Sequence, residues 1–527
     1  MKERLMILGA GIMQGPAIRT ARGMNLETVV VDGNKDAPCA GEADIFEQID
    51  LKDKDRIAEL ALKLKKEGLS GIMTAGTDFS ATVAWAAEKA GLPGIPYEAA
   101  LNASDKGRMR RCFKKAGIPS PDFLVIDQIE RTKAPELPFS YPVVIKPVDN
   151  MGGRGCKRAN NETELRVAVS EALKFSRSGR AIVEEYMDGP EYSVDAIVYD
   201  GKITICGLAD RHIYFPPYFI EMGHTMPAEL NGETADILLE TFKNGVRSLG
   251  LTLGAAKGDI KLTSKGPMIG EIAARLSGGY MSGWTYPYSS GADPAKAAIL
   301  AALGRLDPQN PQGLQRKWNM VSAERAFISI PGTVRAIKIM KSAENNKYVK
   351  NIFFRAREGE RVYFPENNVS KCGNVISAAP CREEAVKAAE DFVRGILIRL
   401  TPRDAGTDNF LYTDTAPENS PETRWPPGAF DTTMSGTFGN EIRGALKKLP
   451  SRKPNPQKAG IVPFPEMLES GAVDYVGRGV TESLDAVRTL TGLELPLDRE
   501  GTLGREFWAA LIRGGYQGAA YLLDNLE

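Results

Sequence analysis

Residues 258–275 are the stretch that most constrains how this chain can fold, because their pattern predicts a β-hairpin. Two segments of alternating apolar residues flank a turn at residues 264–267. Folding the chain about Lys265 places Asp259 opposite Glu271. Cross-strand neighbours have Cβ atoms about 4.5–5.5 Å apart, and like charges at that spacing are destabilising. The pattern therefore predicts a cation between the two carboxylates, which would offset their repulsion.

The alternation of side chains along a strand adds further groups to the face that carries Asp259 and Glu271. Period-2 spacing puts Lys261, Ala273 and Arg275 on the same face. Two carboxylates with basic side chains beside them suit Mg²⁺ together with a nucleoside triphosphate. The alternative is a solvated pair of strands with an ordinary charge clash.

Size and composition indicate a multidomain protein without a global charge bias. A chain of 527 residues predicts three or four domains. Lys+Arg and Asp+Glu are equal at 67 each, so no net field favours nucleic acid or a membrane surface. No apolar stretch approaches the roughly 18 residues of a membrane span. Six cysteines without CxxC spacing argue against zinc and disulfides and favour a reducing cytosol. We therefore expect a cytoplasmic protein with neither nucleic-acid nor membrane partners.

Residues 1–95 alternate buried-strand runs with helical patterns, which predicts a doubly wound α/β domain. The first strand leads into a glycine-rich turn at residues 9–15, and the second strand ends on Asp32. Three residues, rather than two, separate the second and third glycines, so the dinucleotide fingerprint is imperfect. We interpret the turn as mainly structural; the alternative is a nicotinamide-cofactor site.

The rest of the chain divides by pattern into four segments. Residues 96–305 predict an α+β domain with a mobile, β-rich, lid-like part at about 120–195. Residues 306–402 predict a small α+β domain that closes with a helix over residues 382–398. Residues 403–458 are rich in Pro, Thr, Asn, Gly and Asp, which favours a loop or linker, and residues 459–527 predict a helical extension.

Two further motifs carry groups suited to a nucleotide. Lys146 ends a buried strand that runs into a glycine-rich loop at residues 150–155, where backbone N–H groups can approach phosphate oxygens. Glu184 and Glu191 lie seven residues apart at a strand end, where they could accept hydrogen bonds from an adenine amine and a ribose. The alternatives are a flexible hairpin tip with a snorkelling lysine, and two solvated strand-end charges.

The chain has only two histidines, and both fall in one short segment, as His212 and His224. Histidine titrates near neutral pH and often performs acid–base chemistry. The pair predicts a substrate-facing loop, although a structural role is the more frequent outcome for either residue.

The order of these motifs resembles the ATP-grasp superfamily over residues 1–402, with carboxylate–amine (amino-acid-type) ligases and the biotin carboxylase and carbamoyl-phosphate synthetase relatives as the most similar members. The resemblance implies a pre-ATP-grasp α/β domain, an ATP-grasp fold and a small domain behind it. It assigns nucleotide contacts to a group of residues at the phosphates, the adenine and the ribose: Lys106, Lys146, Gly152, Gly153, Arg154, Gly155, Glu184, Glu185, Tyr186, Met187, Glu191, His212 and Lys261.

The same resemblance implies a metal and a substrate site. Asp259 and Glu271 would bind Mg²⁺ or Mn²⁺, and Arg275 would act with Lys146 on the acyl-phosphate or the substrate carboxylate. The acceptor pocket would be lined by His224, Ser277, Gly278 and Gly279. Many family members carry Asn two residues after the second metal carboxylate, where this chain has Ala273, so a second metal would be held less tightly or through water.

The function implied is ATP-dependent ligation. A small-molecule carboxylate would attack the γ-phosphoryl group, and an amine would then displace phosphate from the acyl-phosphate. Bicarbonate would replace the carboxylate in a carboxylase-type alternative, although the chain has no Ala-Met-Lys-Met carrier motif. A non-catalytic nucleotide-binding subunit is a third alternative, and a homodimer is a possible assembly. The sequence does not indicate a role for residues 403–527.

Overall fold

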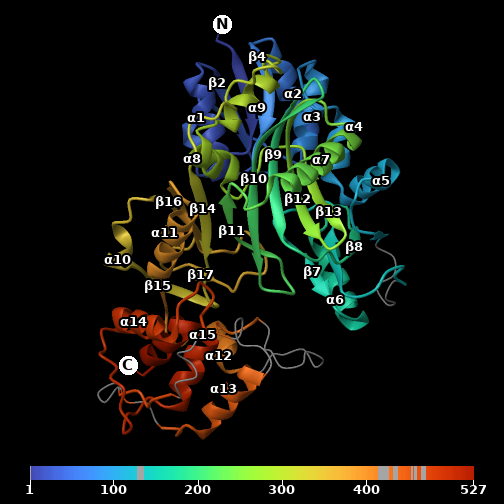
Figure 1. Cartoon of the computed structure of the whole chain (residues 1–527). Helices are drawn as coiled ribbons and strands as arrows, with labels where there is room; N and C mark the ends of the chain where they lie inside the picture. The colour runs from blue at the N-terminus through green and yellow to red at the C-terminus, as the bar shows by residue number, and fades with distance from the viewer. Residues whose placement is uncertain are drawn as a thin grey trace. The chain divides into compact units, whose positions relative to one another are not determined.

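The structure is a computed structural model that describes residues 2–127, 136–413, 426–430, 437–452, 455, 460–464 and 471–526. The chain forms two compact units (Figure 1). The first comprises residues 1–324 and 378–385, and the second comprises residues 325–377 and 386–527. No helix among the described residues is both long and apolar enough to cross a membrane.

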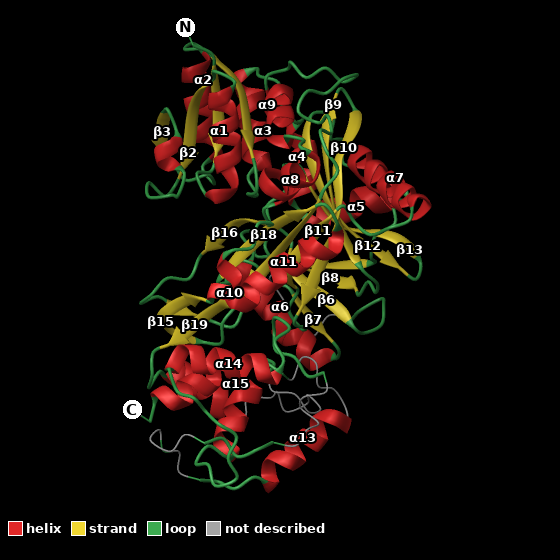
Figure 2. Cartoon of the chain, turned by 60° about the vertical axis from the view of Figure 1, so that its left-hand side comes forward, coloured by secondary structure: helices red, strands yellow, loops and turns green. Residues whose placement is uncertain are grey.

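The first unit begins with the predicted α/β domain, built on a four-stranded parallel sheet in the order β3-β2-β1-β4. Residues 5–8 of β1 are completely buried, as expected for a strand covered on both faces. The strands are β1 (Arg4–Leu8), β2 (Glu27–Asp32), β3 (Ile45–Gln48) and β4 (Leu69–Thr74). The helices, several of which flank the sheet in Figure 2, are η1 (Ile12–Gln14), α1 (Gly15–Gly23), η2 (Ala40–Glu42), α2 (Lys54–Lys65), α3 (Ser80–Ala90) and α4 (Tyr97–Ser104).

A small antiparallel sheet follows, in the order β5-β8-β6-β7. Helix α6 (Glu162–Phe175) covers it through an apolar cluster that includes Val143, Leu165 and Ala172. The glycine-rich loop connects two neighbouring strands of this sheet, so its position is set by their pairing. The strands are β5 (Phe123–Ile126), β6 (Val143–Pro147), β7 (Lys157–Ala159) and β8 (Ala181–Glu185).

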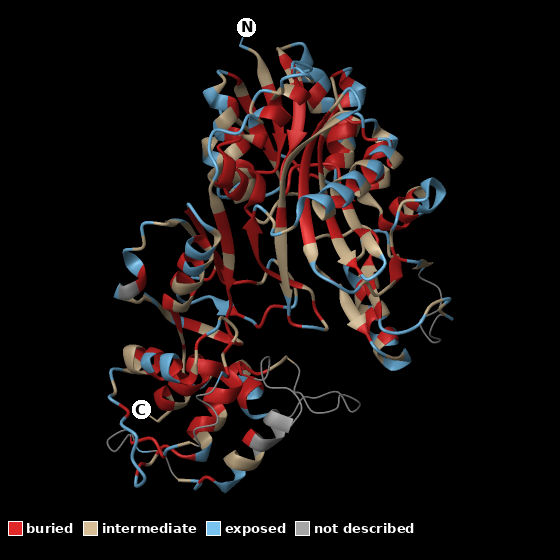
Figure 3. Ribbon diagram, viewed as in Figure 1, coloured by how far each residue is buried: buried red, intermediate tan, exposed pale blue. Residues whose placement is uncertain are grey.

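The large sheet of the first unit has the order β13-β12-β9-β10-β11. Its strands are β9 (Glu191–Tyr199), β10 (Lys202–Tyr214), β11 (Ile220–Met226), β12 (Gly254–Thr263) and β13 (Gly266–Ala273). One face packs on α5 (Lys106–Ala116) and α7 (Gly232–Ser248), where Phe242 and Leu238 meet Ile260 and Ile272. Figure 3 shows the resulting burial along these strands. The opposite face is apolar around Ile197 and Ala255, which pack on α9, and its polar part, with Ser193, Asp195, Lys257 and Asp259, carries the candidate site.

Short helices then connect the large sheet to β14 (Val321–Phe327), which carries the chain into the second unit. They are η3 (Met281–Thr285), α8 (Tyr286–Ser290) and α9 (Pro294–Ala302), and α9 packs against α1 and β4.

The small α+β part of the second unit differs from the sequence prediction at its closing helix. Helix α11 (Arg382–Gly395) ends at residue 395, and residues 396–400 form strand β19 (Ile396–Leu400) instead of continuing the predicted helix to 398. Residues 396–398 are an Ile-Leu-Ile run exposed by at most 2%, which favours a fully buried strand. The other elements are β15 (Gly332–Ile339), α10 (Lys341–Glu344), β16 (Val349–Phe354), β17 (Arg361–Val362) and β18 (Gly373–Ala379).

The described residues of the C-terminal extension form four helices: α12 (Ala405–Tyr412), α13 (Thr437–Lys448), α14 (Val480–Thr491) and α15 (Arg505–Asp524). The first two lie within the segment predicted as a loop or linker, so that prediction is wrong for residues 405–412 and 437–448. Much of the remaining predicted linker (residues 414–425, 431–436, 453, 454 and 456–458) lies outside the described residues. Leu397 of β19 shares one buried cluster with Phe507 and Leu511 of α15, so the extension packs on the α+β part.

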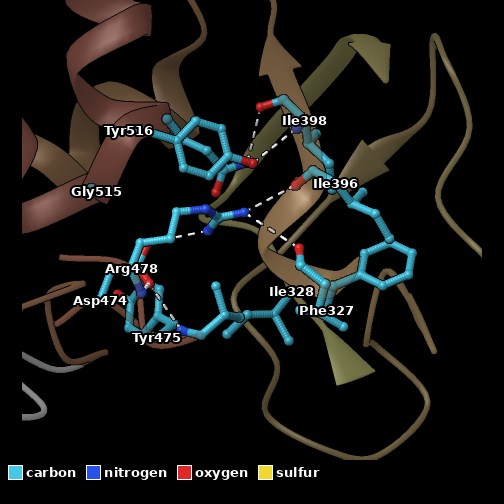
Figure 4. Close-up of a pocket in the computed structure, with 13 residues that line it drawn as sticks. Phe327, Ile328, Ile396, Ile398, Asp474, Tyr475, Arg478, Gly515 and Tyr516 are labelled. Carbon is cyan, nitrogen blue, oxygen red and sulfur yellow. Dashed lines mark hydrogen bonds and ion pairs between the residues drawn. The ribbon is translucent and has the colours of Figure 1, made fainter. Parts of the chain in front are cut away.

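A small pocket within the second unit shows how the extension is attached (Figure 4). Arg478 donates to the carbonyl oxygens of Arg394 and Ile396, at 2.8 and 3.1 Å, and forms an ion pair of 3.1 Å with Asp474. Tyr516 accepts a 2.8 Å hydrogen bond from the N–H of Ile398. The last carbonyls of a helix have no partner within the helix. Arg478 therefore supplies donors at the end of α11.

Candidate active site

The two carboxylates of the hairpin face each other as the sequence predicts, but a bulge is responsible. Thr263 pairs with Gly266, which leaves a two-residue turn, and Asp259 pairs with Glu271 because the register shifts beside Ile260. Gly270 is the extra residue of this bulge. Its carbonyl accepts a 2.5 Å hydrogen bond from Arg110. Without the bulge, Asp259 would lie opposite Gly270.

Basic side chains surround both carboxylates. Asp259 accepts a 2.8 Å hydrogen bond from Ser193 and pairs with Lys257 and, at 3.2 Å, with Arg211. Glu271 lies 3.1 Å from the ammonium group of Lys106. Burial opposes ionisation of Glu271, but the neighbouring lysines outweigh it and lower its pKa to about 2. The pKa of Asp259 is also lowered, by Arg211 and Lys257, against burial. Both groups are charged at neutral pH.

This donor set fits a hard divalent cation that arrives with phosphates. The described residues contain no cluster of three or more His, Cys, Asp or Glu side chains able to enclose a metal ion. Mg²⁺ is usually held by one or two carboxylates together with substrate phosphates and water, so a pair is sufficient. The predicted metal residues, Asp259 and Glu271, are therefore a pair that needs further oxygens from a ligand.

Lys146 is fixed by a buried carboxylate. Its ammonium group lies 2.7 Å from Glu184, which also pairs with Arg110 at 2.9 Å. Glu184 is 2% exposed and Arg110 is completely buried. Against burial, the two cations lower the pKa of Glu184. In this arrangement Glu184 orients Lys146, while its predicted contact with adenine stays a prediction.

The connection between β8 and β9 lies against Lys261. The Lys261 ammonium donates to the carbonyl of Met187 at 3.2 Å and lies 5.5 Å from the ring centroid of Tyr186. It is also 4.0 Å from Glu191, its cross-strand neighbour. Glu185 pairs with Lys265 at 2.7 Å. The structure thus brings the residues predicted for adenine and ribose together along one edge of the hairpin.

Lys106 links the glycine-rich loop to the carboxylate pair. It begins α5, donates a 2.7 Å hydrogen bond to the carbonyl of Asn150 and pairs with Glu271. Burial lowers its pKa, but Glu271 and Asp78 raise it further, so the net shift is upward. Gly152, Gly153 and Gly155 have φ of 70°, 74° and 68°, which only glycine adopts easily. Arg154 donates to the Met151 carbonyl at 3.1 Å.

The segment after the hairpin carries Arg275, Ser277, Gly278 and Gly279. Arg275 is 8% exposed and donates to the carbonyl of Leu276 at 3.0 Å. Ser277 donates to Asp195 and accepts a 3.1 Å hydrogen bond from the N–H of Ser282. A Cβ atom at Gly279 would lie 2.8 Å from Glu221 and 3.1 Å from His224, so this glycine permits a close approach.

The two histidines do not occupy one loop. His212 lies on β10, with its Nε2 atom 3.0 Å from the Thr225 hydroxyl. His224 lies on β11, is completely buried, and has its Nδ1 atom 2.9 Å from Glu324 and its Nε2 atom 3.6 Å from Glu221. The predicted substrate-facing loop is therefore largely strand. His224 still lies beside Gly279, so its substrate role stays a prediction.

Sequence reasoning missed Arg211, Lys257 and Asp195. The cross-strand pairs Arg211–Glu191, Lys257–Asp195 and Asp259–Ser193 place all of them on the polar face of the large sheet. The alternation within each strand was visible in the sequence. The missing information was that β12 pairs with β9, because a helix and two strands separate them in the chain.

Asp195 gives a pH-dependent prediction. It is completely buried, and burial raises its pKa to about 6 although Ser277 donates to it. An unfolded Asp titrates near 3.9. Between about pH 4 and pH 6 the folded protein therefore keeps a proton on Asp195 that the unfolded chain has lost. The stability that the protonated Asp195 contributes is fully present below about pH 4 and is lost as the pH rises through about 6. The unfolding free energy of the wild type minus that of Asp195→Asn should fall by about 2 kcal/mol from about pH 4 to about pH 7. Urea unfolding at both pH values measures it, and a constant difference would contradict it.

Side chains of the first domain itself form hydrogen bonds with the backbone of its glycine-rich turn. Asp32 accepts 2.8 Å hydrogen bonds from the N–H groups of Ala10 and Asn34. Gln14 accepts a 2.8 Å hydrogen bond from the N–H of Gly11 and donates to the carbonyl of Ala75. These contacts use the groups that a dinucleotide would need, which supports the structural interpretation of the turn.

Comparison with known families matches two parts of the chain. Residues 139–283 match the ATP-grasp domain, and residues 326–401 match the L-amino acid ligase C-terminal domain 2. Alanine–anticapsin ligase of Bacillus subtilis is 30% identical, over 43% of this chain and 53% of that protein. Carnosine synthase 1 of Gallus gallus is 26% identical, over 58% of this chain and 35% of that protein. The chain thus spans about a third to a half of these two relatives.

Solved structures share the fold. The L-amino acid ligase from Bacillus licheniformis superposes with a TM-score of 0.66 at 20% identity, over 76% of this chain and 99% of that chain. Phosphoribosylglycinamide synthetase from Anaerococcus prevotii gives a TM-score of 0.60 at 22% identity, over 76% of this chain and 100% of that chain. With the family matches, these superpositions confirm the fold expected from the sequence. The chain thus carries an ATP-grasp domain at residues 139–283, followed at residues 326–401 by a segment that matches the L-amino acid ligase C-terminal domain 2.

Proposed function

We propose that this chain is an ATP-dependent carboxylate–amine ligase of the amino-acid type, which releases ADP and phosphate. The observation that carries the proposal is the pair of facing carboxylates, Asp259 and Glu271, with the ammonium groups of Lys106, Lys146 and Lys257 beside them. The match to an L-amino acid ligase domain supports the amino-acid class of substrate.

In this proposal the nucleotide lies between the small sheet and the large sheet of the first unit. Lys106, Lys146 and the N–H groups of residues 152–155 face its phosphates, and Glu191 with Lys261 faces the ribose. Asp259 and Glu271 hold Mg²⁺ or Mn²⁺, which when bound would offset the charge of the phosphates. A solved structural neighbour, a 2-oxoglutarate carboxylase domain, is described as a dimer in complex with MgADP. We include a homodimer of this chain in the proposal on that ground.

The proposed reaction has two steps. The substrate carboxylate oxygen bonds to the γ-phosphorus of ATP while the bond to ADP breaks, giving an acyl-phosphate. The amine nitrogen then bonds to the acyl carbon, phosphate leaves and the nitrogen loses a proton. Two anions approach each other in the first step, so Lys146 and Arg275 act by neutralising the developing charge.

Positioning of the reactants and exclusion of water supply the remaining part of the proposed rate acceleration. Correct orientation of two reactants can contribute about 7–11 kcal/mol. The glycines at residues 152–155 would let the loop close over the phosphates, which protects an acyl-phosphate from hydrolysis.

ADP release by the purified protein tests the proposal. The assay contains ATP and Mg²⁺ with an equimolar mixture of the twenty protein L-amino acids, with bicarbonate, or with neither. Stimulation by the amino acids, accompanied by a new amide product in mass spectrometry, is the expected result. Stimulation by bicarbonate alone would indicate the carboxylase-type reaction, and nucleotide binding without ADP release would indicate a non-catalytic subunit. Either outcome would overturn the proposal.

A further inference from the structure

The guanidinium group of Arg211 contacts three different carboxylates. It pairs with Glu191, and its Nη1 atom lies 3.2 Å from Asp259. On its other side, its Nε and Nη2 atoms lie 3.0 and 2.9 Å from Oε2 of Glu221. Although burial opposes it, the three carboxylates hold the pKa of Arg211 well above its usual range. The group is therefore a permanent cation at the centre of an acidic cluster.

Strand order explains why these carboxylates converge. Arg211 lies on β10, opposite Glu191 of β9 on one side and His224 of β11 on the other. Asp259 comes from β12, the strand beyond β9. Glu221 comes from β11, and its carboxylate lies against Gly279 and within 3.6 Å of His224. One side chain thus spans four neighbouring strands.

The three carboxylates belong to different parts of the site. Under the proposed function, Glu191 faces the ribose and Asp259 holds the divalent cation, whereas Glu221 borders the segment at residues 277–279 expected to receive the acceptor. Arg211 therefore touches both the nucleotide side and the acceptor side of the proposed site.

We propose that Arg211 is a positioning residue that couples nucleotide binding to binding on the acceptor side. This inference rests on the proposed ligase function and adds to it a linkage between the two sites. A guanidinium presents its donors in one rigid plane, so a change in its contacts with Glu191 and Asp259 alters its contact with Glu221. Each ligand therefore changes the environment of the other through Arg211, and linkage requires the effect to be reciprocal.

Two variants separate this coupling from a merely structural role. Arg211→Lys keeps the charge but loses the planar fork, so it cannot contact all three carboxylates in the same way. Glu221→Gln removes only the acceptor-side charge and keeps nearly the same shape. Arg247→Met is the control, because Arg247 lies on the outer face of α7, is 53% exposed in its side chain and pairs only with Glu240 and Asn244 among the described residues.

Titration calorimetry with a non-hydrolysable ATP analogue (AMP-PNP) and Mg²⁺ gives the measurement. The dissociation constant is determined with and without the equimolar mixture of twenty L-amino acids. In the wild type and in Arg247→Met, we expect the amino acids to tighten nucleotide binding about five-fold or more. In Glu221→Gln, the dissociation constant of the analogue alone should stay within about three-fold of the wild type. Adding the amino acids should then leave that constant almost unchanged. Arg211→Lys should also lose the effect.

The outcomes distinguish this inference from the proposed function. If the wild type does not bind the analogue, the proposed function fails and the inference fails with it. If the wild type binds the analogue and releases ADP but shows no coupling, only the inference is overturned. The same conclusion follows if Glu221→Gln retains wild-type coupling. Should Arg211→Lys not fold, Glu221→Gln decides the question alone.

Discussion

Replacement of Glu271 by Gln is expected to lower amino-acid-dependent ADP release by about a thousandfold while the protein remains folded. The change removes one of the two facing carboxylates and leaves Lys106 without its 3.1 Å partner. Removing a single group that stabilises developing charge typically costs about 10²–10³-fold in kcat, and loss of a metal ligand adds to that. Steady-state ADP release at saturating Mg²⁺ measures the effect.

The matched control for this prediction is Glu240→Gln. Glu240 lies on the exposed face of α7, where it pairs with Lys243 and Arg247. Surface pairs of this kind contribute about 0–1 kcal/mol, so activity and melting temperature should both stay near the wild type. Full turnover of Glu271→Gln would show that the facing carboxylates are not part of the reaction centre.

The largest expected effect on stability comes from Arg478→Met. The substitution removes the donors to the end of α11 and leaves Asp474, which is 6% exposed, without its cationic partner. Breaking a buried ion pair by removing one partner destabilises a protein by about 3–5 kcal/mol. For a unit of this size the melting temperature should fall by about 10 °C, which scanning calorimetry measures.

Lys387→Met provides the comparison for Arg478→Met. Lys387 lies on α11 with 68% of its side chain exposed and pairs with Asp391 at 2.9 Å. Its replacement should change the unfolding free energy by less than about 1 kcal/mol. Equal melting temperatures for the two variants would mean that apolar packing alone holds the extension, and that the contacts of Arg478 add nothing measurable.

The sequence predicted those parts of the fold that depend on local pattern. The alternating strands and helices of the first domain, the helix that begins at Lys106 and the hairpin of Asp259 and Glu271 are all present. Each depends on apolar periodicity, a capping residue such as Asp105 or a short turn, and these are properties of neighbouring residues.

Features that depend on distant strand pairing could not be predicted in the same way. Arg211 joins the site because β10 pairs with β9 and β12 lies on the other side of β9. The first three residues of β19 were predicted as helix because the burial of residues 396–398 depends on the extension, more than 100 residues later. The contact of Glu184 with adenine stays a prediction, but its ion pairs with Arg110 and Lys146 could not be foreseen, because they join residues far apart in the sequence.

The bulge at Gly270 has a consequence for genetic variation in this chain. Ile269 and Ile272 both pack against α7 although two residues lie between them, and Glu271 reaches the opposite face only because Gly270 is left unpaired in the ladder. Deleting the codon for residue 270 would leave Ile269, Glu271 and Ile272 in strict alternation, so Glu271 would still lie opposite Asp259 and the contact of Arg110 with the Gly270 carbonyl would be lost. Loss of this one codon should therefore be far less damaging to the enzyme than loss of the next codon, which encodes Glu271 and with it one of the two facing carboxylates.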